Sequence, residues 1–287
     1  MSDMRGRTVV VTGATTGIGK EAARTLAKQG ADVLLVARDE AKARATKHEL
    51  ERTIAGAKVD WVRCDLASFA SIRAAADEIR AGRERVDVLL NNAGALNSTR
   101  QLSADGHELT FAVNHLAHFL LTHLLRDRLE AAGAPGRAAR VVNVASAIHP
   151  RGRIVWDDLM AERRYASFDV YAASKLCNVL FTYELARRLA PANVTANCLH
   201  PGVIGSGFGH NNRGWLKLGV TLVKPFLWTP EKGARTSIAL ASSPAHEGAT
   251  GRYFDQHGRE RRSARASYDE VAQRRLWELS ETLCGLR

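Results

Sequence analysis

The sequence predicts an α/β fold in which helices cover both faces of a doubly wound parallel sheet. Short apolar runs rich in β-branched residues alternate with helix-like segments, as is typical of β-α-β units. The first run, Thr8–Thr12, leads through a glycine-rich turn directly into a helix pattern. The 287 residues suit one large domain, and the 45% of hydrophobic residues are ample for its core. We therefore expect a single domain over residues 1–287.

The turn after the first strand contains three glycines, in Gly13-Ala-Thr-Thr-Gly17-Ile-Gly19. Gly13 would allow the tight turn, Gly17 would let the backbone approach a pyrophosphate, and Gly19 would let helix pack on strand. The helix that follows is closed by Gly30 and would offer N–H donors and a positive dipole end to phosphate. The spacing differs from G-x-G-x-x-G, but strand, turn and helix together predict a dinucleotide site.

The second strand, Asp32–Ala37, should end at the adenosine ribose of the dinucleotide. An acidic residue there would accept from the ribose 2′-hydroxyl and favour NAD. The strand is instead followed by Arg38, which can make a forked contact with a 2′-phosphate and so favours NADP. The alternative is an ordinary surface arginine at the end of a strand.

A helix over Glu40–Arg52 and a strand over Lys58–Arg63 are expected next. Asp65 follows that strand at the carboxyl edge of the sheet. It can accept from the adenine amino group, cap a helix that begins near Ser68, or do both.

The fourth strand, Val86–Leu90, leads into Asn91-Asn92-Ala93-Gly94, whose small residues would let the backbone lie against a coenzyme. Residues 105–132 predict one or two long helices, and Asn114 interrupts an apolar stretch within them. A buried asparagine must find hydrogen-bond partners.

Three histidines, His115, His118 and His123, are close enough in sequence to suggest a metal site. No carboxylate or thiol completes a ligand set beside them. We therefore expect packed or hydrogen-bonded histidines and no metal.

The fifth strand, Arg140–Ala145, ends at Ser146, and a later helix that runs to about Leu189 contains Tyr171 and Lys175. Positions i and i+4 of a helix share a face, so the ammonium should lie close to the phenol. A nearby cation favours the phenolate. We expect Lys175 to lower the pKa of Tyr171 and make it usable for proton transfer. The alternative is a surface tyrosine beside a solvated lysine.

The last third of the chain begins with a strand over Asn193–Leu199 and a break at His200-Pro201-Gly202. Residues 203–228 are glycine-rich, then apolar and basic, and predict a substrate lid or, less favoured, an amphipathic segment that touches a membrane. Pro230 begins a further helix, and Gly251–Phe254 predicts the last strand. Ser267-Tyr-Asp-Glu270 predicts a capping box for a helix from Tyr268 to about Leu283, within the C-terminal segment 267–287.

The composition excludes several classes of function. The net charge is +11, but the arginines are scattered and no nucleic-acid motif is present. No stretch approaches the ~20 apolar residues of a membrane span, and the first strand begins too early for a signal peptide, so we expect no stable membrane insertion. Four separated cysteines predict reduced thiols and a cytoplasmic location.

The glycine turn, the Asn91–Gly94 segment, Asn114, Ser146 and Tyr171-x-x-x-Lys175, in this order, resemble the short-chain dehydrogenase/reductase family and its Rossmann fold. Residues 12–21, 113–121 and 171–180 are similar to the retinol-dehydrogenase-like branch. The chain departs from that branch in two ways. Many members have an N-terminal membrane anchor, which this sequence does not show. Residue 16 is Thr where many NADP-dependent relatives have a basic residue, so the coenzyme prediction rests on Arg38 alone.

The resemblance implies an NADP(H)-dependent oxidoreductase that acts on a lipophilic alcohol, aldehyde or ketone. Tyr171 would act as general acid in reduction and general base in oxidation, and Ser146 would orient the carbonyl oxygen. Lys175 would hold the nicotinamide ribose, and Asn114 would support a water that links Lys175 to solvent. The implied coenzyme-binding residues are Gly13, Thr15, Thr16, Gly17, Ile18, Gly19, Arg38, Asp65, Leu66, Asn92, Ala93, Gly94, Tyr171, Lys175, Pro201, Gly202 and Val203.

Relatives commonly pair through the helices that correspond to residues 105–132 and 168–190. We expect a homodimer or tetramer, with a monomer as the alternative. Two other functions occur on the same fold. An epimerase or dehydratase of nucleotide-sugars would be longer and begin with a different glycine spacing. A non-catalytic nucleotide sensor or scaffold would often lack Tyr171 or Lys175.

Overall fold

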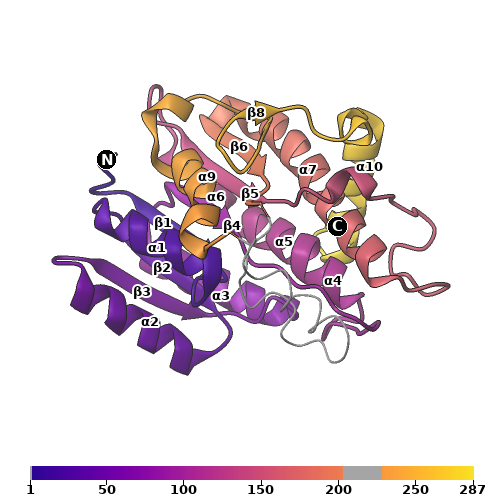
Figure 1. Ribbon diagram of the computed structural model, residues 1–287, viewed down its shortest axis with the longest axis horizontal. Coiled ribbons are helices and arrows are strands. Elements are labelled where there is room, and N and C mark those ends of the chain that lie inside the picture. Colours follow the sequence, from indigo (N-terminus) through magenta and orange to yellow (C-terminus); the bar gives the residue numbers. More distant parts are fainter. Residues whose placement is uncertain (1, 203–227) are drawn as a thin grey trace.

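A computed structural model describes residues 2–202 and 228–287. The predicted lid, apart from Trp228, lies outside the described residues, as does Val203. The described residues form an eight-stranded sheet in the order β3-β2-β1-β4-β5-β6-β7-β8 (Figure 1). All neighbouring strands are parallel except β7 and β8, which are antiparallel. The doubly wound parallel sheet is thus confirmed, with one antiparallel edge.

The strands lie at or within two residues of their predicted positions, except for the short strand β8, which was not predicted. Two residues are too few to show an alternating pattern, so β8 forms only because it pairs with β7. The strands are β1 (Thr8–Thr12), β2 (Asp32–Ala37), β3 (Lys58–Arg63), β4 (Val88–Asn91), β5 (Ala139–Val144), β6 (Val194–Leu199), β7 (Arg252–Phe254) and β8 (Glu260–Arg261).

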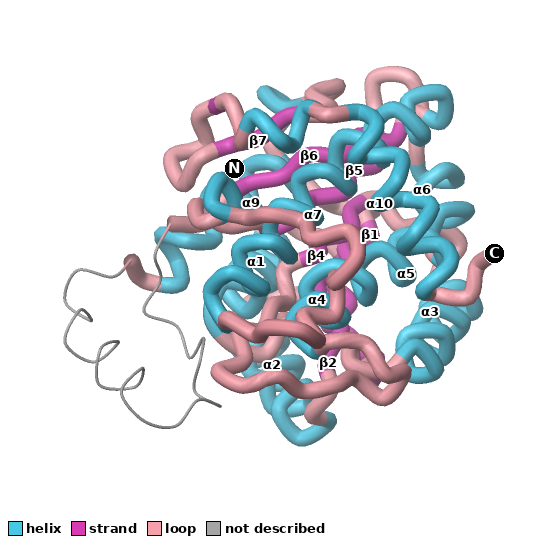
Figure 2. The backbone as a smooth tube through the Cα atoms, turned by 90° about the vertical axis from the view of Figure 1, so that its right-hand side faces the viewer, coloured by secondary structure: helices cyan, strands magenta, loops and turns pink. Residues whose placement is uncertain are grey.

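Helices cover both faces of the sheet, and Figure 2 shows β1 and β4 between the two layers. Val9 and Val11 of β1 face one layer, and Val10 faces the other. This arrangement explains why the central strands are almost entirely buried, whereas the edge strand β3 is partly exposed. The first layer contains α1 (Gly17–Lys28), α2 (Glu40–Thr53) and α9 (Pro230–Ser242); the second contains α3 (Phe69–Gly82), α5 (Ala117–Leu124), α6 (Arg126–Ala132) and α7 (Ser167–Leu189).

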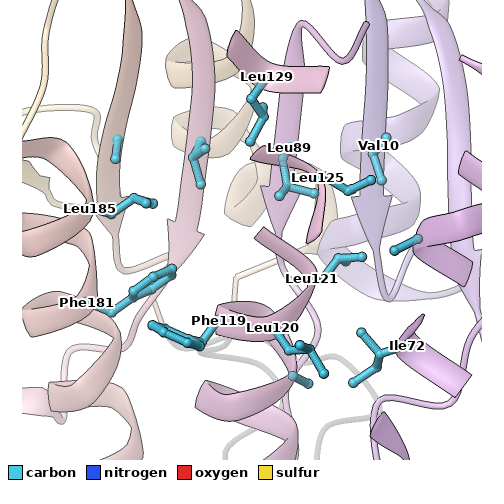
Figure 3. Close-up of a cluster of buried hydrophobic side chains, with 14 of the residues drawn as sticks. Val10, Ile72, Leu89, Phe119, Leu120, Leu121, Leu125, Leu129, Phe181 and Leu185 are labelled. Carbon is cyan, nitrogen blue, oxygen red and sulfur yellow. The ribbon is translucent and has the colours of Figure 1, made fainter. Parts of the chain in front are cut away.

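The C-terminal helix α10 (Glu270–Leu283) packs on the second layer. Its Trp277 ring lies 4.9 Å from Phe119 of α5 and 5.9 Å from Phe181 of α7, and these two rings are 5.5 Å apart. Figure 3 shows Phe119 and Phe181 side by side in this core. Helix α10 therefore covers part of the outer face of α5 and α7, the helices through which pairing was expected.

The long helical segment expected over residues 105–132 is interrupted twice. It begins with α4 (Leu109–Phe111), continues through a π-helical turn at Ala112–Leu116, and breaks again at Leu125 between α5 and α6. The buried Glu108 carboxylate caps its start by accepting from Thr110 N at 2.9 Å and Phe111 N at 2.7 Å. Because π-helical turns are frequent at functional sites, the presence of Asn114 in such a turn is consistent with a functional role for this residue.

The predicted capping box at Ser267–Glu270 is wrong. Asp269 caps α10 instead, accepting from Val271 N at 2.9 Å and Ala272 N at 3.1 Å. The Ser267 hydroxyl is turned inward, where it bonds the Ala264 carbonyl oxygen at 2.6 Å. Ser267 lies in one of the short 3₁₀ turns that the described part of the chain contains, which are at His149–Arg151, Ala190–Ala192, Pro244–His246 and Arg265–Tyr268.

No helix within the described residues is both long enough and apolar enough to cross a membrane.

Candidate active site

The predicted site residues gather at the carboxyl edge of the sheet, around the point where the strand order reverses. That reversal lies between β1 and β4, which are neighbours in the sheet although β2 and β3 separate them in sequence. In open α/β sheets, ligands bind in the crevice at such a switch point. The glycine turn follows β1, the Asn91–Gly94 segment follows β4, and Ser146 follows β5.

The glycine turn has the shape that a pyrophosphate site needs. Gly13 has a φ of 65° and Gly17 a φ of 56°, which other residues rarely adopt. A side chain at Gly19 would place its Cβ 2.4 Å from both the Gly13 carbonyl oxygen and Asn92 Nδ2. Thr16 precedes α1 but makes no side-chain capping bond to its first turn. The backbone N–H groups at the start of α1 therefore face a cradle that fits a phosphate group.

Thr12, which the sequence analysis did not single out, ties the glycine turn to the segment after β4. Its hydroxyl accepts from Asn92 N at 2.9 Å and from Ala93 N at 3.0 Å. The Asn92 side chain donates back to the Thr12 carbonyl oxygen at 2.9 Å. A threonine at the end of a buried strand, just before a glycine turn, was the only signal for this role in the sequence.

The end of β2 presents cations rather than a free acid. Arg38 is exposed, and Asp39 accepts from Lys42 N at 3.0 Å as the N-cap of α2. Arg63 ends β3 opposite Ala37, the last residue of β2, and Arg38 follows Ala37 directly. Arginine side chains at such a position can make forked contacts with a phosphate group.

Asp65 does not cap α3, so that part of its prediction is wrong. Its Oδ1 accepts from Ala67 N at 3.0 Å, and the Ser68 hydroxyl caps the helix by accepting from Ser71 N at 3.4 Å. Leu66 is half-buried and packs against the core. Asp65 therefore shapes the turn at the sheet edge where the adenine contact is predicted.

Ser146, Tyr171 and Lys175 come together at the end of β5 and on α7. The Ser146 hydroxyl hydrogen-bonds the Tyr171 phenol. Lys175 Nζ lies 5.8 Å from the centre of the Tyr171 ring and donates to the Val144 carbonyl oxygen at 3.0 Å. Lys175 is only 2% exposed, so its charge is held within the protein. The arrangement places two hydroxyls and one ammonium around one point.

The effect expected of Lys175 on the Tyr171 pKa is not what the structure shows. Burial raises the pKa of Tyr171 to about 12, and the hydrogen bond with Ser146 opposes this rise. Burial also lowers the pKa of Lys175 to about 8. Loss of solvation thus dominates both pKa values, which the spacing of the two residues could not reveal.

Asn114 is fully buried and has the partners that its position required. Its Oδ1 accepts from Ala95 N at 2.7 Å, and its Nδ2 donates to Ala95 O and to the Ser174 hydroxyl, both at 2.9 Å. Ser174 in turn donates to the Tyr171 carbonyl oxygen at 2.8 Å. Asn114 therefore connects the segment after β4 to the turn of α7 that contains Tyr171.

The three clustered histidines take part in packing and hydrogen bonding. His115 Nε2 lies 2.9 Å from the Ser280 hydroxyl of α10. His118 bridges Asn114 O and the Thr12 hydroxyl, each at 3.1 Å. Burial lowers the pKa of His115 to about 3 and that of His118 to about 4, so both rings are neutral. Within residues 2–202 and 228–287, no group of histidine, cysteine and acidic side chains could hold a metal.

Comparison with known proteins adds to this geometry. A model of the short chain dehydrogenase family matches residues 7–217. Human retinol dehydrogenase 14 is 41% identical over 304 residues, covering 99% of this chain and 88% of the relative.

Two solved structures resemble the whole fold. An uncharacterised protein from Mycobacterium paratuberculosis superimposes with a TM-score of 0.79 at 34% identity, over 99% of this chain and 96% of that one. The NADP complex of RhlG from Pseudomonas aeruginosa has a TM-score of 0.71 at 25% identity, over 89% of this chain and 96% of that one.

Proposed function

The chain belongs to the short-chain dehydrogenase/reductase family, and on that premise we propose that it is an NADP(H)-dependent oxidoreductase of lipophilic alcohols, aldehydes or ketones. The observation that carries the proposal is the meeting of Ser146, Tyr171 and Lys175 at the switch-point edge of the sheet. The glycine turn would hold the pyrophosphate of the coenzyme, and Lys175 would hold its nicotinamide ribose. When bound, the coenzyme supplies or accepts the hydride.

The proton chemistry favours reduction of a carbonyl. With a pKa of about 12, the Tyr171 phenol keeps its proton at neutral pH. A carbonyl oxygen placed beside Ser146 and Tyr171 can accept a hydrogen bond from each hydroxyl. As that oxygen gains negative charge, Tyr171 transfers its proton to it, because an alkoxide is more basic than a phenolate. Ser146 holds the oxygen in place during the transfer.

The positive charge of Lys175 also favours proton transfer from Tyr171 to the substrate oxygen. Its ammonium is mostly protonated at pH 7 because its pKa is about 8. The Val144 carbonyl oxygen holds it one turn from Tyr171. A phenolate formed by the transfer would be stabilised by this neighbouring cation.

The preference for NADP(H) rests on the exposed Arg38 and on the use of Asp39 as a helix cap. The NADP bound in the Pseudomonas aeruginosa relative supports it. We expect Arg38→Ala to reduce kcat/KM with NADPH by roughly ten- to a hundredfold, because one charge-assisted contact is lost. The kcat/KM with NADH should change little. Steady-state rates with both coenzymes measure this.

Arg52→Ala is the matched control for that substitution, because Arg52 is an exposed arginine at the far end of α2. It should leave the ratio of the two coenzymes unchanged. A wild-type preference for NADH, or an equal loss with both coenzymes in Arg38→Ala, would refute the assignment.

The lipophilic substrate class is supported by the identity with human retinol dehydrogenase 14. A panel of aliphatic, aromatic and polyene aldehydes, ketones and alcohols, followed by nicotinamide absorbance with each coenzyme, tests it. Turnover of small polar carbonyls in preference to long apolar ones would contradict the class. A wild-type protein that binds NADPH and turns over no member of the panel would favour the non-catalytic sensor.

We also propose a cytoplasmic location. All four cysteines are buried and free, as is usual for proteins of a reducing compartment. Cell fractionation should recover the protein in the soluble fraction after a high-salt wash. A pool released only by detergent would contradict this prediction.

A further inference from the structure

His149 lies three residues beyond Ser146 and is bonded to the backbone of that residue. Its Nδ1 is 2.8 Å from the Ser146 carbonyl oxygen, and its own backbone N donates to the same oxygen at 3.1 Å. Its Nε2 is 3.0 Å from Ala264 N, in the segment that precedes α10. The side chain is only 2% exposed, so water does not substitute for either contact.

The two partners determine which nitrogen of His149 carries the proton. The backbone N–H of Ala264 can only donate, so Nε2 must accept from it. The Ser146 carbonyl oxygen can only accept, so Nδ1 must carry the hydrogen and donate. Burial lowers the pKa of His149, which keeps the ring in this one neutral form at neutral pH. A protonated ring would turn an N–H toward the N–H of Ala264.

Other residues prevent the His149 ring from turning. The Tyr253 ring of β7 packs against it with 4.7 Å between ring centres. The Tyr253 hydroxyl is bonded to His200 Nδ1 at 2.5 Å. His200 lies directly before Pro201 and Gly202, the residues predicted to contact the coenzyme. The ring is thus held between the end of β5, the end of β6 and the C-terminal segment.

The Ser146 backbone is the part of the proposed active site that these contacts restrain. The Ser146 hydroxyl points to Tyr171, and Ile148 N lies 3.4 Å from the hydroxyl oxygen. A shift of about 1 Å in a reacting group can reduce the rate by about 10²-fold. The direction of the hydroxyl depends on the peptide that His149 holds.

We propose that His149 is a positioning residue, which aims the Ser146 hydroxyl at the substrate oxygen by holding the Ser146 carbonyl through Nδ1–H. The inference rests on the proposed function, because Ser146 must act on the substrate for its position to matter. The bond from Ala264 N determines which ring nitrogen of His149 carries the hydrogen, although 115 residues separate the two in the chain.

Two matched substitutions separate positioning from packing. In His149→Asn, the side-chain amide can take the place of Nδ1–H and donate to Ser146 O. In His149→Gln, the amide reaches the place of Nε2 and loses the contact with Ser146. His246→Gln is the control, since His246 packs against Phe254 at 5.2 Å in the turn after α9. Steady-state kinetics, NADPH titration and thermal melting are measured for each variant, alone and combined with Ser146→Ala.

We expect His149→Gln to lower kcat for carbonyl reduction by roughly 10- to 100-fold, with NADPH affinity unchanged. His149→Asn should stay within about threefold of wild type. In the Ser146→Ala background, His149→Gln should cause no further loss, because the group that it positions is gone.

Equal losses for His149→Gln with and without Ser146 would show a packing role and overturn the inference, and so would a large loss in His149→Asn. If Ser146→Ala lowers kcat and His149→Gln does not, the inference alone fails. If Ser146→Ala is fully active, the proposed function fails at Ser146 and the inference with it. Should His149→Gln not fold, ¹⁵N NMR of the wild-type ring decides the matter, since an Nε2–H tautomer would refute the proposed contact.

Discussion

Replacing Tyr171 with phenylalanine is expected to lower kcat for carbonyl reduction by at least about 10²–10⁴-fold, the usual loss for a general acid. The substitution keeps the ring and removes only the hydroxyl. Coenzyme affinity should therefore survive, and a fluorescence titration with NADPH measures this beside the steady-state rate. Ser146 loses its hydrogen-bond partner in the same variant, so the two residues should act as one unit.

The control for Tyr171→Phe is Tyr165→Phe. The Tyr165 hydroxyl donates to the Asn97 carbonyl oxygen at 2.8 Å, so this variant also loses a half-buried phenolic hydrogen bond. We expect its kcat to stay within about threefold of wild type, with a stability loss of about 1 kcal/mol. A Tyr171→Phe enzyme that binds NADPH and turns over as fast as Tyr165→Phe would remove Tyr171 from the mechanism.

Replacing Lys175 with methionine is expected to have opposite effects on activity and stability. The charge beside Tyr171 disappears, and turnover should fall by about 10²–10³-fold, as for the loss of one preorganised donor. NADPH binding should weaken as well if Lys175 holds the nicotinamide ribose. The free energy of unfolding should rise, because burial depresses the lysine pKa from 10.5 to about 8, a penalty of about 3 kcal/mol before the lost bond to Val144 is counted.

The pH dependence of stability checks the origin of this effect. A lysine whose folded-state pKa is lowered destabilises the folded protein fully below pH 8, where it is charged in both states. That penalty fades as the pH rises from about 8 toward 10.5, where the unfolded chain also loses the proton. The gain in melting temperature of Lys175→Met over wild type should therefore be largest below pH 8 and shrink above it. A gain that does not depend on pH would show that packing, rather than the buried charge, causes it.

Much of the fold could be predicted from the sequence because its signals are local. β1 and β2 lie at their predicted bounds because each is a short, nearly continuous apolar run. β3 also lies at its predicted bounds, although charged residues interrupt its apolar ones. Gly30, with a φ of 92°, ends α1 as its glycine predicted. Pro230 begins α9, and the Thr229 hydroxyl caps it by accepting from Lys232 N at 3.4 Å.

The predictions were wrong where two nearby residues can each cap a helix. They also missed the point where an α-helical turn is replaced by a π-helical one. Ser267 and Asp269 can each cap a helix, and only the inward bonds of the Ser267 hydroxyl decide between them. Asp65 and Ser68 compete in the same way at α3. The π-helical turn at Asn114 has an extra residue per turn, which a 3.6-residue period does not reveal.

The sequence by itself determined which groups meet at the edge of the sheet, because the ends of parallel strands share one edge and the i and i+4 positions of a helix share one face. It placed the glycine turn after β1, Ser146 after β5 and Tyr171 one turn from Lys175. Only the tertiary structure decided the electrostatics of these groups. The pKa of Tyr171 is raised rather than lowered because surrounding elements exclude water from the phenol. That burial depends on how all the elements pack together, which no local sequence pattern shows. The bond from Ala264 to His149 joins residues that are far apart in the chain, and no local pattern encodes which distant N–H will meet a given ring nitrogen.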